Sequence, residues 1–155
     1  MLKNRLTEVL NDKAIGYEII HHQADYSAME AAQDTHTPGK EFAKAVVLNT
    51  PAGPALAVLP APRMVDFRKF AALVGADEVR LASEDTLFNL FPDCQVGAEP
   101  PFGHLYGMPV YVDEELVEEE YITFNAGSHD EAIRIRFADF EALEHPTRAR
   151  FTVQA

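Results

Sequence analysis

Residues 42–59 read FAKAVVLNTPAGPALAVL, and this stretch decides the fold. Residues 43–48 and 55–59 are two runs of small and β-branched apolar side chains, a composition typical of β-strands. Residues 49–54 lie between them and hold two prolines, a glycine and an asparagine, which favour a turn over regular structure. The stretch therefore predicts a β-hairpin joined by a six-residue loop.

Helix and strand signals alternate irregularly on both sides of this hairpin. Ser27 followed by Glu30 has the form of a capping box, Asp66 suits a helix N-cap, and Gly75 suits the end of the same helix. We expect helices at residues 2–15, 28–35, 67–74, 84–91 and 138–143, with Gly16 ending the first, and further strands at residues 17–22, 79–82, 109–112, 121–124, 132–136 and 150–153. Without strict βαβ alternation, the pattern predicts a mixed α/β (α+β) fold, and we expect residues 1–155 to form a single domain.

Composition limits the classes of function. The chain has 155 residues and one cysteine, Cys94, which excludes an internal disulfide framework and suits the cytoplasm. It has no run of about 18 apolar residues and no signal-peptide pattern at its start, so we expect no membrane association. A net charge of −12 opposes wrapping of DNA or long contact with RNA. The acidic residues crowd into positions 113–120, which we interpret as a solvated face.

The first candidate site residue is Lys44. Side chains alternate along a strand, so Lys44 shares a face with Val46 and Leu48. If that face is buried, Lys44 points inward, which is costly unless the ammonium meets an anion or lines a wet pocket. The alternative is that Lys44 extends along the strand edge and keeps its ammonium in water.

The second candidate is the loop at residues 97–103, with the sequence GAEPPFG. Two prolines and two glycines exclude regular structure there. The loop's backbone could approach a ligand closely, and its free amides could polarise a carbonyl or hold an oxyanion. The alternative is a tight structural turn.

The third candidate is the loop at residues 124–130, with the sequence FNAGSHD. Gly127 permits a bend that presents Ser128 and His129. A serine beside a histidine suggests a nucleophile and its base, but adjacency does not create that geometry, and no Gly-x-Ser-x-Gly elbow is present. We therefore interpret His129 as a polar contact in a pocket.

Metal and cofactor sites have no support in the sequence. His21 and His22 are neighbours on an expected strand and must point to opposite faces, so they cannot chelate one metal together. No zinc motif, Walker loop or dinucleotide fingerprint occurs. Cys94 has the character of a small buried side chain. We expect no metal and no cofactor.

Taken in order, these segments resemble the YbaK family of tRNA-editing domains, which also occurs inserted in some bacterial prolyl-tRNA synthetases. The resemblance spans nearly the whole chain and is one of order and spacing. It is carried by AKAVVL at 43–48, AVLP at 57–60, LVGA at 73–76, GAEPPFG at 97–103, PVYVD at 109–113 and NAGSH at 125–129. The acidic stretch at 113–120 is not part of it.

The resemblance implies a fold and a site. The fold would be a mixed, curved sheet flanked by helices, with one pocket at its mouth. Lys44 matches the family's functional lysine, and residues 97–101 match its Gly-x-x-x-Pro loop, whose amides hold the aminoacyl carbonyl in relatives. These matches imply catalytic roles for Lys44 and Gly97. The implied substrate-binding residues are Pro101, Phe102, Gly103, Gly127, Ser128 and His129.

The function implied is trans-editing: hydrolysis of the ester of a mischarged tRNA by water, in a cytoplasmic enzyme. The implied substrate is tRNA-Pro carrying Ala or Cys, or a related pair. The expected partners are the acceptor end of tRNA, held near Lys40, Lys44 and Arg63, and an aminoacyl-tRNA synthetase. The alternative is a non-catalytic module that uses the same pocket for a small aminoacyl-like ligand or a partner protein. A generic esterase is disfavoured because no nucleophile–base pair is recognisable.

Overall fold

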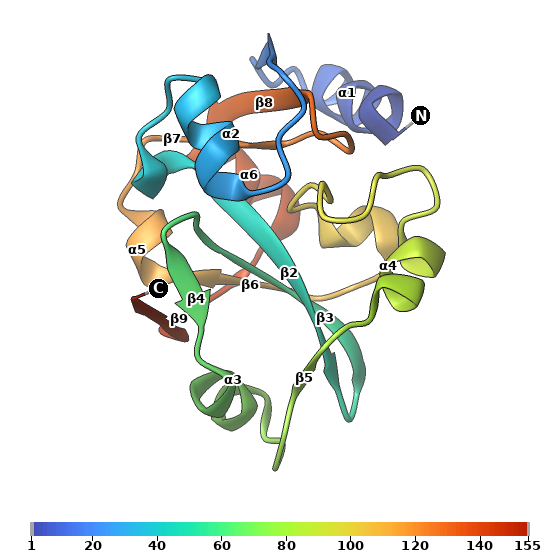
Figure 1. Ribbon diagram of the computed structural model, residues 1–155, viewed down its shortest axis with the longest axis vertical. Coiled ribbons are helices and arrows are strands. Elements are labelled where there is room, and N and C mark those ends of the chain that lie inside the picture. Colours follow the sequence, from blue (N-terminus) through green and yellow to red (C-terminus); the bar gives the residue numbers. More distant parts are fainter. Residues whose placement is uncertain (1, 155) are drawn as a thin grey trace.

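The computed structural model describes residues 2–154, with side chains described from Arg5 onward (Figure 1). The helices are α1 (Leu2–Asp12), α2 (Ala28–Asp34), α3 (Phe67–Val74), α4 (Glu84–Leu90), α5 (Glu114–Val117) and α6 (Phe137–Glu144), with 3-10 turns at Gly39–Glu41 and Gly103–Tyr106. The strands are β1 (Glu18–His21), β2 (Ala43–Thr50), β3 (Gly53–Pro60), β4 (Arg63–Val65), β5 (Arg80–Leu81), β6 (Val110–Asp113), β7 (Tyr121–Asn125), β8 (Glu131–Arg136), β9 (Thr147–Ala149) and β10 (Thr152–Gln154). No helix within residues 2–154 is long and apolar enough to cross a lipid bilayer.

The hairpin predicted from residues 42–59 is the long antiparallel pair β2–β3. Its register runs from Ala43 opposite Pro60 to Thr50 opposite Gly53, so only two residues form the turn. The six-residue loop expected from the sequence is therefore wrong. The Thr50 hydroxyl donates to the Gly53 carbonyl at 2.7 Å and accepts from the Ala52 amide at 3.2 Å, and this local bonding lets the strands extend into the Pro/Gly stretch.

The strands fall into three groups, of which the largest is the mixed sheet that was expected. A mixed five-stranded sheet has the order β5-β2-β3-β6-β9, with β3, β6 and β9 parallel to one another. An antiparallel sheet has the order β1-β8-β7, and β4 pairs with β10. A parallel bridge between Phe42 and Thr123 joins the first two sheets, and it places β7 beside the start of β2. The fold is nevertheless of the predicted mixed α/β class, with helices flanking a mixed sheet.

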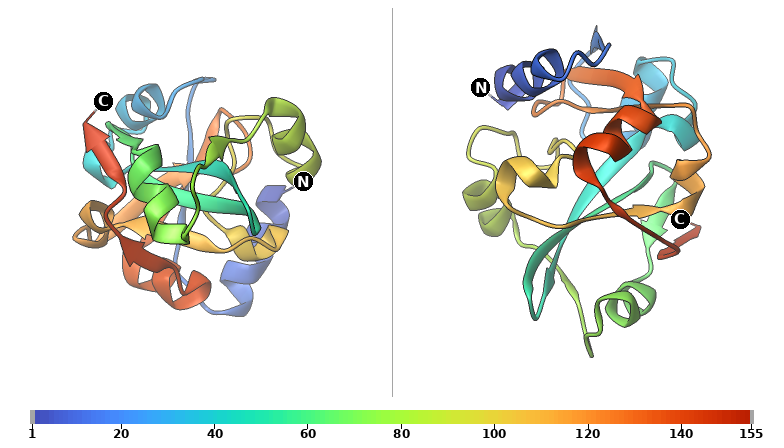
Figure 2. Two further views of the ribbon diagram at one scale, coloured as in Figure 1. Left: turned by 90° about the horizontal axis from the view of Figure 1, so that it is seen from below. Right: turned by 180° about the vertical axis from the view of Figure 1, so that it is seen from behind.

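Helices cover the five-stranded sheet on both faces. Leu6 of α1 and Phe140 of α6 are fully buried in the larger core, together with Val47 of β2. Phe70 of α3 packs on the opposite face of the hairpin, against Leu48. Figure 1 shows α6 behind β2 and β3, and Figure 2, seen from behind, shows it lying across them. Alternation along β2 therefore assigns odd-numbered and even-numbered residues to different cores.

The predicted helix boundaries are confirmed by their caps. The Ser27 hydroxyl accepts from the Glu30 amide, and the Asp66 carboxylate accepts from the amides of Arg68 and Lys69. Gly75 ends α3 in the left-handed region at φ 70°. The strands β4 and β9 and the short helix α5 were not predicted, because three- or four-residue elements carry too little periodicity to be recognised.

The acidic stretch at 113–120 is not simply a solvated face, as the sequence had suggested. Asp113 is buried, caps α5 through the Glu115 amide and accepts from the Phe151 amide at 3.2 Å. Glu114 pairs with Arg150 at 2.6 Å. Asp113 and Glu114 therefore hold the C-terminal segment against α5. The clustering of acidic residues in the sequence did not reveal this structural role.

Gly103 lies where the larger core tolerates no side chain. A Cβ atom built on it would come within 2.6 Å of both the Met108 carbonyl oxygen and Val110 Cγ2. We expect Gly103→Ala to lower the free energy of unfolding by about 1–3 kcal/mol, because the backbone around Met108 must shift. Gly16→Ala is the control, since nothing lies within 4 Å of its Cβ position, and its change should stay within about 0.5 kcal/mol. Urea unfolding measures both, and equal midpoints for the two variants would contradict this packing.

Candidate active site

Lys44 lies on β2 and points to the α3 side of the hairpin. It stands opposite Leu59 in the β2–β3 register and shares its face with Val46 and Leu48, which pack in the core around Phe70. Lys44 itself is half-buried, and burial lowers the pKa of its ammonium. Within the part of the chain whose side chains are described, Lys44 makes no hydrogen bond or ion pair. Half-buried and without an anion, this ammonium is set up for a negatively charged or polar ligand.

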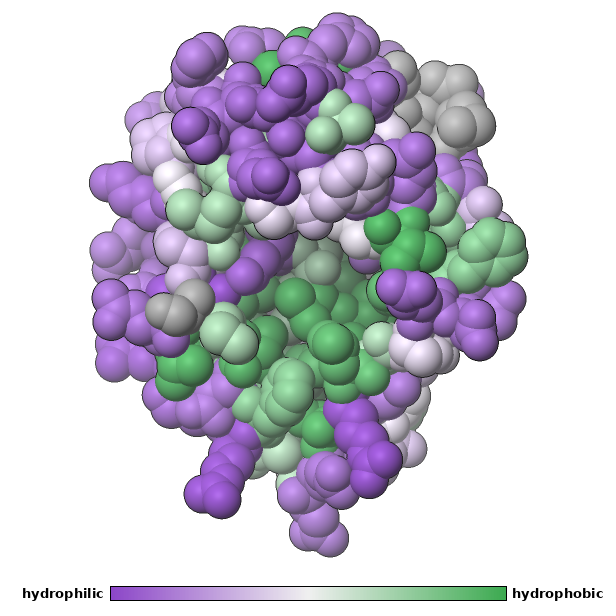
Figure 3. Space-filling view, viewed as in Figure 1, coloured by the Kyte–Doolittle hydropathy of each residue, from purple (hydrophilic) through white to green (hydrophobic). Residues whose placement is uncertain are grey.

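A hollow with an apolar floor opens on this side of the molecule. Figure 3, in the orientation of Figure 1, shows hydrophobic side chains gathered over β2 and β3, between α2 on one side and α3 on the other. Hydrophilic side chains form most of its rim. A concave, mostly apolar surface with a few converging polar groups is the usual form of a small-ligand site.

Strand β7 borders this site beside Lys44. The bridge between Phe42 and Thr123 sets the alignment, so Lys44 and Asn125, each two residues further along, face the same side of the paired strands. The Asn125 Oδ1 and Thr123 Oγ1 atoms are buried and have no hydrogen-bond partner within residues 5–154. Buried polar atoms normally have a partner, so Asn125 is a candidate ligand contact that the sequence did not single out.

The two loops predicted separately from the sequence are joined in the structure. The Gly127 amide donates to the Ala98 carbonyl at 3.0 Å, and the Gln95 amide donates to the Gly127 carbonyl at 2.8 Å. The Gln95 side chain in turn accepts from the His129 amide at 2.7 Å. These bonds fix residues 95–98 against residues 127–129 at the end of β7, close to the start of β2.

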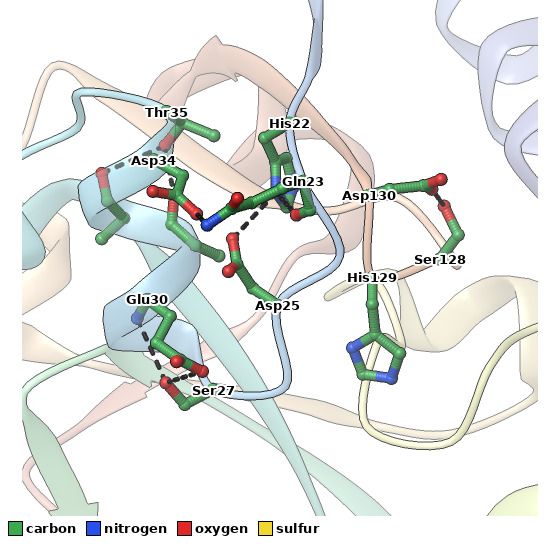
Figure 4. A network of polar contacts seen from close by, with 12 residues as sticks. His22, Gln23, Asp25, Ser27, Glu30, Asp34, Thr35, Ser128, His129 and Asp130 are labelled. Carbon is green, nitrogen blue, oxygen red and sulfur yellow. Dashed lines mark hydrogen bonds and ion pairs between the residues drawn. The ribbon is translucent and has the colours of Figure 1, made fainter.

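His129 is held in one orientation. Its Nε2 lies 2.9 Å from the Val96 carbonyl oxygen, and a carbonyl can only accept, so Nε2 carries a hydrogen and donates it. The Ser128 hydroxyl does not pair with this ring but donates to the Asp130 carboxylate at 2.8 Å (Figure 4). The expectation that adjacent Ser128 and His129 do not form a nucleophile–base pair is confirmed.

Glu99 occupies the amides that the sequence had assigned to the substrate. Its carboxylate accepts from the Gly97 amide at 2.6 Å, where Gly97 has a φ of 91°. Burial raises the pKa of Glu99, and the backbone amides of residues 97–99 and the nearby His129 only partly offset this. The Gly97 amide is therefore already bound to an oxygen of the Glu99 carboxyl group. A Cβ on Gly97 would also stand 3.4 Å from His129 Cε1.

Three of the implied substrate-binding residues lie in the interior. Pro101 is buried, and Phe102 is in edge contact with Phe124 and Phe140 in the larger core. Gly103 is buried beneath Met108. The second half of the Gly/Pro loop thus anchors the first half, and its side chains do not form a pocket surface.

A buried acid–histidine pair supports the segment in front of α2. The His22 side chain is 1% exposed and that of Asp25 is 5% exposed, with His22 Nδ1 3.1 Å from Asp25 Oδ2 (Figure 4). Burial raises the pKa of Asp25, and the nearby Asp34 raises it further. His21, on the opposite face, is 74% exposed in its side chain, as strand alternation required. Nothing in the local sequence distinguished Asp25 from a surface acid, because its burial depends on α2 and on residues 129–130.

The structure gives little support for a functional role of Arg63 or Cys94. Arg63, assigned to a basic zone for tRNA, pairs with Glu115 at 2.8 Å and donates to Thr152, so its charge is largely committed. Burial raises the pKa of Cys94 to about 12, which keeps the thiol protonated and agrees with its interpretation as a packed side chain. Among residues 5–154, no three His, Cys, Asp or Glu side chains are arranged to hold a metal ion.

The fold and this site define an aminoacyl-tRNA editing domain. Residues 22–143 match the family described as the aminoacyl-tRNA editing domain, and the chain belongs to that family. Editing is hydrolysis of the ester that joins an amino acid to tRNA, so at the family level the chain is an aminoacyl-tRNA deacylase.

Relatives agree with this assignment. The Multifunctional Ser/Thr-tRNA deacylase ProXp-y of Escherichia coli (strain K12) is 26% identical over 152 residues, which cover 95% of this chain and 90% of the relative. A crystal structure described as a candidate trans-editing enzyme for prolyl tRNA synthetase matches with a TM-score of 0.86 at 23% identity, over 97% of this chain and 96% of the other. The hypothetical protein APE2540 matches with a TM-score of 0.86 at 18% identity, over 96% and 99% of the two chains. The two structures show the shared fold.

The burial of Glu99 makes stability depend on pH in a defined direction. Its pKa in the folded state lies above the ordinary value of 4.5, so the folded state keeps a proton that the unfolded state has lost. Glu99 therefore adds to the free energy of unfolding at pH values below 4.5, and this contribution is lost as the pH rises through the folded-state pKa. We expect the melting temperature of Glu99→Gln, minus that of the wild type, to increase as pH rises from about 4.5 to 7.

The exposed Glu120→Gln variant is the control for loss of one surface carboxylate, and it should show little such trend. A melting-temperature difference for Glu99→Gln that stays flat with pH, or falls, would show that Glu99 ionises freely in the folded state.

Proposed function

We propose that this chain removes a small, wrongly attached amino acid from tRNA, with the ester bound beside Lys44 and next to the loop at residues 97–99. The observation that carries the proposal is the half-buried Lys44 ammonium, which lies on the β2 face of Val46 and Leu48 and has no carboxylate partner among the described residues. The family match supports the reaction class. We further propose that the chain acts as one editing domain, because Leu6 and Phe151, outside the matched residues, are buried in its cores.

In this mechanism Lys44 holds the end of the tRNA. Its ammonium would contact the terminal phosphate or ribose, an anionic or polar group that compensates for the burial of the charge. The half-buried Val46, on the same face, offers apolar surface for a small amino-acid side chain. Placement of the ester between these groups supplies the orientation on which hydrolysis of an already activated ester depends.

The loop amides would stabilise the oxyanion that forms when water attacks. The Glu99 carboxylate bound at the Gly97 amide supports this role, because a carboxylate oxygen and a tetrahedral oxyanion require the same donors. Glu99 would then give way as the substrate binds. A protein nucleophile is disfavoured: Ser128 donates to Asp130, and Cys94 keeps its proton. The attacking water is therefore assisted by the substrate's own ribose hydroxyl or amino-acid side chain.

We propose that the amino acid removed is small. The sequence resemblance and the relative from Escherichia coli favour different small amino acids. The sequence resemblance favours Ala or Cys on tRNA-Pro, whereas the relative from Escherichia coli is named for Ser and Thr. Contact with tRNA is limited to its acceptor end, because the net charge is −12 and Arg63 is paired with Glu115. Weak contact of this kind favours action together with an aminoacyl-tRNA synthetase.

Replacement of Lys44 tests the mechanism. We expect Lys44→Ala to lower kcat/KM for deacylation by about a hundredfold or more, because the contact that positions the ester is lost. Lys44→Arg should restore only part of the activity, since a planar guanidinium does not replace a compact ammonium. Lys13→Ala, an exposed lysine just beyond α1, is the matched control and should retain wild-type rates. Deacylation by Lys44→Ala at the wild-type rate would exclude the proposed role.

A panel of charged tRNAs tests the substrate and separates the enzyme from a binding module. We expect tRNAs carrying Ala, Cys, Ser or Thr to lose the amino acid at least tenfold faster than in buffer alone, and a tRNA carrying Phe to be spared, because one small pocket discriminates against a large side chain. Release of free amino acid measures turnover. Binding of these tRNAs with no release of amino acid would favour the non-catalytic alternative.

A further inference from the structure

Tyr26 is an exposed aromatic residue at the edge of the candidate site. Its relative exposure is 79%, higher than that of any other exposed large hydrophobic residue in the described part of the chain. One side of its ring contacts His129, with the ring centroids 4.9 Å apart and the planes tilted by 41°. The other side faces solvent. A side chain of this size at such exposure has little to contribute to the core, and a ligand contact would account for its position.

The backbone on both sides of Tyr26 is fixed. The Asp25 amide donates to the His129 carbonyl at 3.0 Å, and the Asp25 carboxylate is bound to the buried His22. On the other side, Ser27 caps α2 through the Glu30 amide. Figure 4 shows this segment descending from His22 past Asp25 to Ser27, beside the loop that carries His129. The Tyr26 ring is therefore presented from a rigid support, which lowers the entropic cost of binding a flat ligand.

The position of Tyr26 relative to the loop amides suggests what that ligand is. His129 lies between Tyr26 and the loop. Its ring contacts the tyrosine ring at a tilt, its Nε2 donates to the Val96 carbonyl, and its Cε1 lies 3.4 Å from the Cβ position of Gly97. In an aminoacylated tRNA the ester and the terminal base are attached to the same ribose. An ester carbonyl at the amides of residues 97–99 would therefore hold the base about one ribose away, in the region of the Tyr26 ring.

We propose that Tyr26, supported by His129, is the stacking platform for the terminal adenine base of the tRNA substrate. This inference rests on the proposed function, since it takes the ester to lie at the loop. Stacking on an aromatic ring requires no charge on the protein. It therefore suits a chain with a net charge of −12, which disfavours extensive contact with the phosphate backbone. Tyr26 is a binding residue and takes no part in the proton transfers of hydrolysis.

Two small ligands that differ only by the base test this directly. NMR titration of the wild-type chain with AMP and with ribose 5-phosphate should give a dissociation constant about tenfold lower for AMP, the range expected for one stacked base. The ratio should fall to near one in Tyr26→Ala and persist in Tyr26→Phe and Tyr26→Trp, which keep an aromatic ring. The control is Tyr121→Ala, because Tyr121 is a partly exposed aromatic residue at the start of β7, far along the strand from the 126–130 loop. This variant should keep the wild-type ratio of the two dissociation constants.

Equal affinities of the wild type for the two ligands, or a preference for AMP that survives in Tyr26→Ala, would overturn the platform. These outcomes are independent of turnover, because they concern binding alone. In deacylation of charged tRNA, Tyr26→Ala should raise KM about tenfold and change kcat by less than about threefold. A wild-type chain that prefers AMP through Tyr26 yet releases no amino acid would refute the proposed function and leave the base site standing.

Discussion

Alternation along strand β2 is the constraint on which the site depends. Ala43, Ala45 and Val47 face the larger core with α1 and α6, and the side chains between them face α3. Because the β2–β3 register is fixed over eight residue pairs, a shift by one residue would bury Lys44 among the aromatic side chains of the larger core. The same pairing that forms the hairpin thus keeps Lys44 out of the larger core and on the face that carries Val46 and Leu48.

The second constraint is the pairing of two loops that are distant in sequence. Residues 95–98 and 127–129 exchange backbone and side-chain hydrogen bonds, and the buried Phe102 holds the first loop to the core. Each loop would be a mobile turn by itself. Together they fix the His129 ring and the positive-φ Gly97, so the proposed oxyanion donors belong to a loop whose conformation is set by the fold.

Charge on this protein has structural as well as functional consequences. Asp113 and Glu114 hold the C-terminal segment, and Glu115 neutralises Arg63, a cation that would otherwise attract phosphates. With Arg63 neutralised, Lys44 is the cation that the proposed site offers to a nucleic acid.

Sequence alone determined the hairpin, the helix caps and the candidate Lys44, because strand alternation and capping are local rules that a few neighbouring residues satisfy. It also supplied the two loops, through glycine and proline. Only the tertiary structure decided which loop residues reach a ligand: Phe102 went to the core, Glu99 took the Gly97 amide, and Asp25 was buried behind Tyr26. Those outcomes depend on contacts between segments up to about a hundred residues apart, and burial, which sets the cost of a charge or an unpaired amide, is a property of the assembled neighbours and not of the residue itself.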